Sequence, residues 1–137
     1  MASKLLGEIE LQTNDAHAVV RLSFIEKFHD WSGYRCTLAV VSGGFSCTRP
    51  FYFDEVALSL VVPELERMAS GASGKCIIKG QWEQDYIQLE SNTKGHVVVT
   101  GELFENAEIA QQLKFGFRTD QTVLLPFAKD LRVLQDA

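Results

Sequence analysis

Apolar and polar residues alternate along most of the chain, which predicts a protein built mainly from β-strands. In the segment 8–13, Ile9 and Leu11 point to one side and the residues between them are polar, the period-two pattern of a half-buried strand. In the segment 19–28, Val20, Leu22 and Phe24 form the predicted buried face. Similar patterns predict six further strands at 34–41, 45–53, 75–82, 86–89, 96–104 and 113–117.

The segment 45–53 contains a proline, which restricts its place in a sheet. Pro50 lacks the N–H group that a strand donates to its neighbour. We therefore expect either a bulge near Arg49 and Pro50 or a position at the edge of the sheet. The preceding Ser42-Gly43-Gly44 predicts a tight hairpin turn, because paired glycines supply the positive φ that such a turn needs.

Two segments carry apolar residues at helical spacing. The first stripe is Leu58, Val61, Val62, Leu65, Met68 and Ala69, and the second is Leu124, Phe127, Ala128, Leu131 and Leu134. The first helix is expected to be capped by Asp54 or Ser59, with Pro63 in or near its first turn, where a missing N–H costs no hydrogen bond. We interpret Asp120-Gln121-Thr122 as the cap of the second helix rather than as an anion site.

The two helical segments also resemble each other in amino-acid sequence. SLVVPELERMA from Ser59 and TVLLPFAKDLR from Thr122 align so that Pro63 matches Pro126. Each half of the chain then reads as four strands followed by one helix, and the halves 8–70 and 75–135 are a predicted pseudo-repeat. Chance is the alternative, because any amphipathic helix with an early proline would align in this way.

These patterns predict one α+β domain over residues 1–137. It is expected to contain about eight mostly antiparallel strands in the order ββββα repeated twice, with the helices packed on the concave face of a curved sheet. A two-layer sandwich is the alternative architecture. The length of 137 residues and an apolar share of 46% are those of an ordinary globular domain with a core of its own.

Composition limits the classes of partner and the cellular compartment that we expect for this protein. The net charge of −5 disfavours nucleic acid and leaves a basic protein as a partner that electrostatic attraction would favour. No apolar run is long enough to cross a bilayer and the start of the chain has no secretory pattern, so we expect a cytoplasmic protein without membrane contact. Cys36, Cys47 and Cys76 are an odd number and lack CxxC spacing, which predicts buried, reduced thiols.

Catalytic and cofactor motifs are absent from the sequence, and neither a cofactor nor a metal ion is expected. His17, His29 and His96 have no second ligand residue at metal-binding spacing. The cluster His29-Asp30-Trp31 could hold a base oriented by a carboxylate, but turn formation and core packing by the tryptophan explain it better.

One predicted hairpin combines acidic and aromatic residues, the types that favour a protein-binding surface. Its members are Trp82, Glu83, Asp85, Tyr86 and Glu90. Tyrosine and tryptophan are enriched among interface residues that contribute most to binding. A hairpin tip is also a place where solvated charge collects without any function, and this interpretation stays open.

Several stretches resemble a family of uncharacterised small bacterial proteins. They are GHVVVTGEL from Gly95, LKFGFRTDQTVLLPFAKDL from Leu113, the loop Asp30-Trp31-Ser32-Gly33 and the helical LVVPELERMASG from Leu60. The resemblance spans about residues 20 to 134. In layout the chain is also loosely similar to WapI-type immunity proteins, which neutralise toxin domains in contact-dependent bacterial competition. This resemblance implies a binding protein without catalysis, and it transfers no site residues.

The sequence therefore favours a non-catalytic protein-binding module, immunity-like, with an acidic surface. One alternative is a self-associating structural protein, which predicts a homodimer because free strand edges pair readily. The other is a small-ligand-binding protein, which predicts a deep pocket between helices and sheet.

Overall fold

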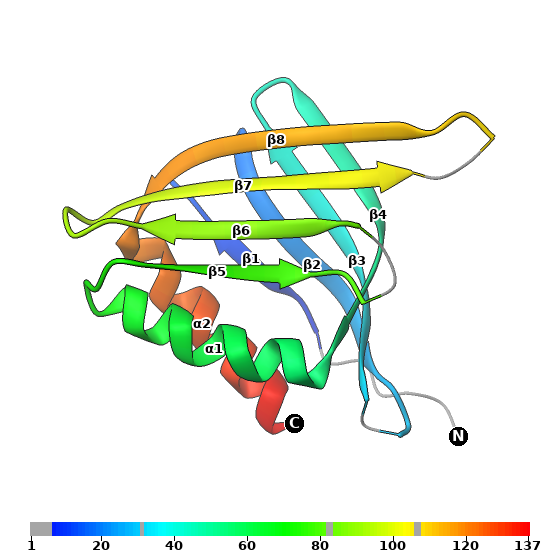
Figure 1. Cartoon of the computed structure of the whole chain (residues 1–137), viewed down its shortest axis with the longest axis horizontal. Coiled ribbons are helices and arrows are strands. Elements are labelled where there is room, and N and C mark those ends of the chain that lie inside the picture. The colour runs from blue at the N-terminus through cyan, green and yellow to red at the C-terminus, as the bar shows by residue number, and fades with distance from the viewer. Residues whose placement is uncertain (1–6, 31, 82–83, 106–107) are drawn as a thin grey trace.

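The first half of the chain folds into four antiparallel strands followed by a helix. The computed structural model describes residues 7–30, 32–81, 84–105 and 108–137. The strands are β1 (Ile9–Gln12), β2 (Ala18–Lys27), β3 (Gly33–Ser42) and β4 (Phe45–Asp54), and the helix is α1 (Glu55–Ala69). They form a sheet in the order β1-β2-β3-β4 (Figure 1).

The second half repeats this order. Its strands are β5 (Gly74–Lys79), β6 (Tyr86–Ser91), β7 (His96–Glu105) and β8 (Gln111–Asp120), followed by a 3-10 turn, η1 (Gln121–Val123), and the helix α2 (Leu124–Asp136). The sheet order is β5-β6-β7-β8, and all its strand pairs are antiparallel. The predicted α+β class and the twofold ββββα order are thus confirmed. The strands are divided between two sheets rather than joined in one.

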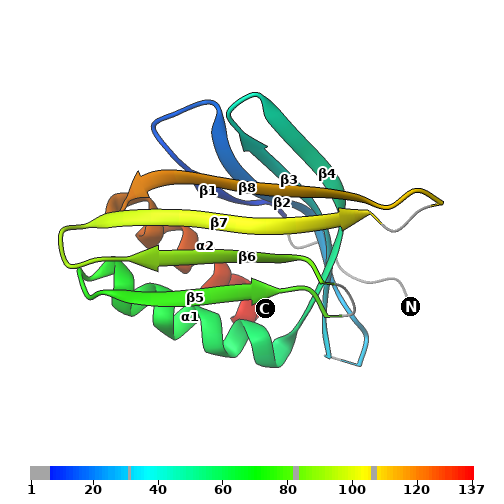
Figure 2. The ribbon, with the colours of Figure 1, turned by 45° about the horizontal axis from the view of Figure 1, so that its top comes forward.

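The two sheets cross each other, and the helices close the side on which the sheets diverge (Figures 1 and 2). α1 follows the first sheet in the chain but packs beside β5, the first strand of the second sheet. α2 follows the second sheet and packs beside β1, while α1 and α2 also pack against each other. On the opposite side β3 contacts β8, so the elements surround a common interior.

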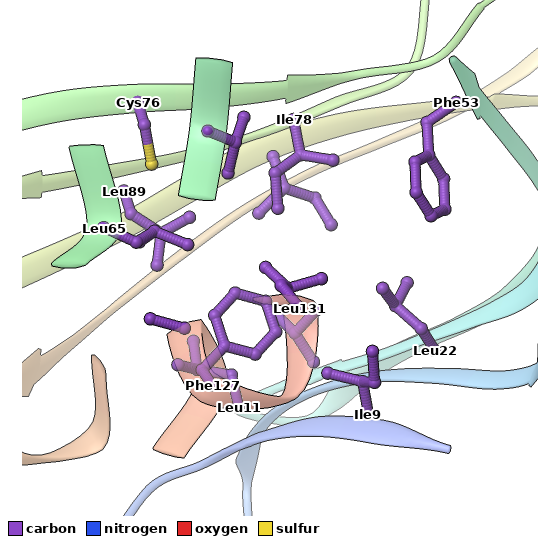
Figure 3. Close-up of a cluster of buried hydrophobic side chains, with 14 of the residues drawn as sticks. Ile9, Leu11, Leu22, Phe53, Leu65, Cys76, Ile78, Leu89, Phe127 and Leu131 are labelled. Carbon is purple, nitrogen blue, oxygen red and sulfur yellow. The ribbon is translucent and has the colours of Figure 1, made fainter. Parts of the chain in front are cut away.

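A hydrophobic cluster fills this interior and draws residues from both sheets and both helices. Figure 3 shows its middle, where the labelled side chains point toward one another: Ile9, Leu11, Leu22 and Phe53 from the first sheet, Cys76, Ile78 and Leu89 from the second, and Leu65, Phe127 and Leu131 from the helices. Burying one such aliphatic or aromatic side chain contributes about 1.5–3 kcal/mol. Because the two halves share this cluster, each buries apolar side chains against the other.

A bulge in β2 changes the face on which two residues lie. The pairing of β2 with β3 shifts between Ser23 and Glu26, and Phe24 takes a positive φ of 51°. The extra residue reverses the alternation, so Phe24 is 70% exposed and Ile25 is fully buried. The prediction that Phe24 lies on the buried face was therefore wrong. The register of β3 with β4 is regular through Pro50, and β4 is an edge strand, which is one of the two positions predicted for it.

Aspartates cap the entry to both helical segments. The Ala57 amide donates to Asp54 Oδ1 at 2.6 Å, and the Thr122 amide donates to Asp120 Oδ1 at 2.9 Å. Asp54 is one of the two caps predicted for the first helix, and the capping role of Asp120 is confirmed. Pro63 lies inside α1 rather than in its first turn, since the helix begins at Glu55. That expectation, which followed from the N–H group that proline lacks, was wrong.

Candidate functional site

Asp85, predicted to belong to an acidic surface, is buried. Its side chain has no exposed area, and Oδ2 lies 2.6 Å from Nε of Arg49 on the other sheet. The Phe104 amide donates to Oδ1 at 3.1 Å. A buried carboxylate needs such partners, because leaving it unpaired would cost several kcal/mol. Asp85 therefore joins the two sheets and offers no surface to a partner, which corrects its place in the predicted site.

Two other members of the predicted surface lie on the outer face of the second sheet, the face turned away from the core. Glu90 is exposed and Tyr86 is half-buried there, whereas Trp82 and Glu83 lie outside the described residues. In the strand register Glu90 stands opposite Lys75, and Tyr86 stands opposite Lys79. The described charges of this outer face are Lys75, Lys79, Lys114 and Arg118 against Glu90, Glu102 and Asp120. The face around Tyr86 and Glu90 is consequently not acidic.

The cluster at residues 29–31 lies in the loop between β2 and β3. His29 and Asp30 are exposed, and they line a shallow hollow with Phe28 and Ser32. Asp30 Oδ1 accepts a hydrogen bond from the Ser32 amide at 3.0 Å, and the hydrogen bonds from Ser32 lower the pKa of Asp30. This contact is that of a turn. Trp31, the third residue of the cluster, lies outside the described residues.

An acidic groove lies between β1 and the start of α2, far from the predicted hairpin. It measures about 480 Å³ and is lined by Glu8, Glu10, Gln12, Thr13 and Asn14 on one side and by Thr122, Val123, Pro126 and Asp130 on the other. Glu8, Glu10 and Gln12 share the outer side of the edge strand β1 because strand side chains alternate. Asp130 comes from α2, which packs beside β1.

One guanidinium partly balances the charge of this groove. Arg21 on β2 lies opposite Glu10, with Nε 2.9 Å from Glu10 Oε2 and 3.6 Å from Glu8 Oε1. The side chain of Glu8 remains 57% exposed despite this contact. Glu8 and Glu10 therefore share the attraction of one cation, and Asp130 adds a third carboxylate to the lining. The groove thus keeps a negative potential that a basic group could relieve.

The cysteines offer little chemistry. Cys36 and Cys76 are buried, and burial raises the pKa of each thiol to about 12. Cys47 is half-buried, and its pKa is also raised, mainly by burial. Thiols with raised pKa values are poor nucleophiles because the thiolate is the reactive form.

The described part of the chain holds neither a group of metal-ligating side chains nor a membrane-spanning helix. In these residues no three His, Cys, Asp or Glu side chains come together in a group that could hold a metal ion. Neither helix is long and apolar enough to cross a bilayer, judged over the same residues.

Comparison with known proteins identifies the class of protein. The immunity protein WapI-like family matches residues 8–135, a stretch that runs from just before β1 almost to the end of α2. The chain therefore belongs to this family, and the predicted similarity to WapI-type immunity proteins is confirmed. No curated protein matches the chain.

Sequence reasoning missed the acidic groove, although part of its signal was visible. The alternation at 8–13 places Glu8 and Glu10 on one face of a strand. Asp130 lies on the exposed side of the second helical pattern. Nothing in the sequence brings these two elements together, because α2 packs against the sheet of the other half.

Proposed function

We propose that this chain is an immunity protein that binds a protein toxin and blocks it without catalysing a reaction. Membership of the WapI-like immunity family carries the proposal. A small ligand between the helices and the sheet, the alternative site, is disfavoured because the apolar cavity between Leu22, Leu58 and Leu131 measures only about 10 Å³. That volume holds about one water molecule and excludes a metabolite.

The acidic groove between β1 and α2 is the surface we propose for contact with a basic part of the toxin. Its negative potential would attract Lys and Arg side chains during encounter and fix the orientation of the complex. Glu8 and Asp130 are exposed and approach the groove from opposite walls, so a basic side chain could reach both. The outer face of the second sheet, where lysines outnumber glutamates, would not attract the same partner.

The test pairs this chain with any toxin domain encoded beside its gene. Growth of cells that express the toxin domain is measured with and without the chain. The affinity of the purified pair is measured by calorimetry, and its association rate by stopped-flow mixing, each at low and high salt. We expect rescue of growth, a stoichiometric complex, and an association rate that falls as salt rises. A chain that relieves no toxicity and forms no complex would refute the proposed function.

Charge variants then locate the surface. Glu8→Gln combined with Asp130→Asn is expected to slow association about tenfold and to flatten its salt dependence, because electrostatic steering acts mainly on the association rate. Glu90→Gln combined with Glu102→Gln removes the same number of charges from the other face and is the matched control. Equal effects of the two pairs would show that net charge matters and the groove does not.

A further inference from the structure

The unpaired side of β4 can be identified from one hydrogen bond. β4 is the last strand of the first sheet, and its partner β3 lies on one side only. On the other side, the Gln81 amide donates to the Tyr52 carbonyl at 2.7 Å. The N–H and C=O groups of Tyr52 therefore point away from β3. Because backbone direction repeats every two residues along a strand, the N–H and C=O groups of Thr48 and Ser46 point the same way.

The part of this edge at Pro50 and Tyr52 is already protected, and the part at Ser46 and Thr48 is open. Tyr52 is occupied by Gln81, and Pro50 has no N–H group to offer. Ser46 and Thr48 are exposed, and within the described residues no strand pairs with this side of β4. Natural proteins usually block their free edges, so an open stretch at the end of a blocked edge is a place where another strand can be added.

The open stretch of β4 forms one wall of a groove. The groove measures about 270 Å³, and its lining residues run over 46–49 of β4, 103–105 of β7 and 111–113 of β8. β8 is the last strand of the second sheet. It is held to the first sheet by Ser42 of β3, whose Oγ donates a hydrogen bond to the Gly116 carbonyl at 3.1 Å. The groove thus lies between edge strands that belong to different sheets.

The chemistry of this groove fits an extended backbone better than a charged side chain. Ser46, Thr48, Gln111 and Gln112 are uncharged, and the Arg49 guanidinium is paired with buried Asp85. Among the described residues, Glu105 is the one lining residue with an exposed charge. The other available groups are mainly backbone donors and acceptors spaced for a strand, with neutral hydroxyl and amide side chains around them. Such an edge binds a peptide through main-chain hydrogen bonds, and the side-chain pockets set specificity.

We propose that a short extended segment of the toxin domain adds to the β4 edge at Ser46 and Thr48, within the groove between β4 and β8. This inference rests on the proposed function and names a second contact beside the acidic groove. A partner loop suits the site better than a second copy of this chain. Residues of β8 line the groove opposite β4, so a second copy would bring a whole sheet against this wall, whereas a loop brings a single strand.

Amide hydrogen exchange, measured residue by residue, tests the proposal. In the free chain the amides of Ser46 and Thr48 should exchange fast, and those of Cys47 and Arg49, which point to β3, should exchange slowly. In the complex with the toxin domain that the chain binds, the amides of Ser46 and Thr48 should become protected at least about tenfold. Slow exchange in the free chain would overturn the proposal, because the edge would then already be occupied.

Variants of one residue separate the backbone from the side chain. Thr48→Pro removes the N–H group at the open edge, and the strand already accommodates Pro50 two residues further on. Thr48→Ala keeps the N–H group and is the matched control. We expect Thr48→Pro to weaken toxin binding about five- to tenfold and Thr48→Ala to leave it unchanged, since the lost bond is one main-chain hydrogen bond.

The outcomes distinguish this inference from the function on which it rests. If the wild-type chain binds the toxin domain but Ser46 and Thr48 stay unprotected, the edge contact is refuted and the proposed function stands. Equal loss of binding in the proline and alanine variants also refutes it. Protection that appears in the free chain as its concentration rises, together with a dimer in light scattering, assigns the edge to a second copy instead. If the wild-type chain binds no toxin domain, both proposals fail.

Discussion

Asp85→Ala is expected to destabilise the fold more than any surface substitution. The change leaves the Arg49 guanidinium without the carboxylate at 2.6 Å, and it removes the acceptor of the Phe104 amide. Removing one partner of a buried ion pair typically costs about 3–5 kcal/mol. The side chain of Arg49 is 14% exposed, so water can solvate part of the guanidinium charge once the carboxylate is removed. We therefore take the lower end of that range. We therefore expect a loss of about 3 kcal/mol in the free energy of unfolding.

Urea unfolding and thermal melting measure this loss. For a chain of this length, about 3 kcal/mol corresponds to a fall of roughly 10 °C in Tm. The double variant Arg49→Met with Asp85→Leu is the control, because it replaces both charges by apolar groups. It should recover most of the stability, since paired apolar groups can substitute for a buried ion pair. A loss below about 1 kcal/mol for Asp85→Ala would refute the structural role of the pair.

Two further predictions concern a helix cap and the thiols. Asp120→Ala should cost about 1 kcal/mol at neutral pH, the usual value of a cap. The hydrogen bonds from Thr122 lower the pKa of Asp120 below its unfolded value of about 3.9. The cap's contribution is therefore present above that pH and is lost as the pH falls through the lower folded value, so the difference measured by urea unfolding should shrink as the pH falls below about 3.9. In the native chain at about pH 8, a thiol reagent should modify Cys47 well before Cys36 and Cys76, whose buried thiols have pKa values of about 12. Mass spectrometry measures the rate at each cysteine, and fast modification of Cys36 would contradict the closed core.

Local patterns were sufficient to predict the elements of the fold, and they failed where the backbone departs from regular geometry. The alternation at 8–13 and the helical stripe beginning at Leu58 depend only on which residues face a core, and the structure has both. The bulge in β2 requires Phe24 to adopt a positive φ, which bulky residues rarely do. No glycine marks that position in the sequence, so the alternation was extended one residue too far.

The site was harder to predict than the fold because its residues come from elements that meet only through tertiary packing. Asp85 sits in a polar turn, where solvated charge is the usual expectation, yet Arg49 of the other sheet holds it in the interior. The acidic groove needs β1 and α2 side by side. The chain order suggests instead that each helix covers its own sheet, and nothing in composition or spacing shows that the two helices are exchanged.

This exchange of helices also clarifies the predicted pseudo-repeat. The capping residues Asp54 and Asp120 lie 66 positions apart, and so do all five matching buried positions of the helices: Leu58 and Leu124, Val61 and Phe127, Val62 and Ala128, Leu65 and Leu131, Met68 and Leu134. Glu66 and Arg132, again 66 apart, meet across the helix pair with Arg132 Nε 3.3 Å from Glu66 Oε2.

The prolines that suggested the repeat lie only 63 positions apart, so they align the two helices out of register by three residues. Matching caps and matching buried positions support a repeat more strongly than matching residue types do, because caps and buried positions follow from the same contacts of each helix with a sheet. A repeat of this kind would also account for the architecture. Each four-stranded unit lacks a cover at its first strand, and the helix that supplies the cover comes from the other unit.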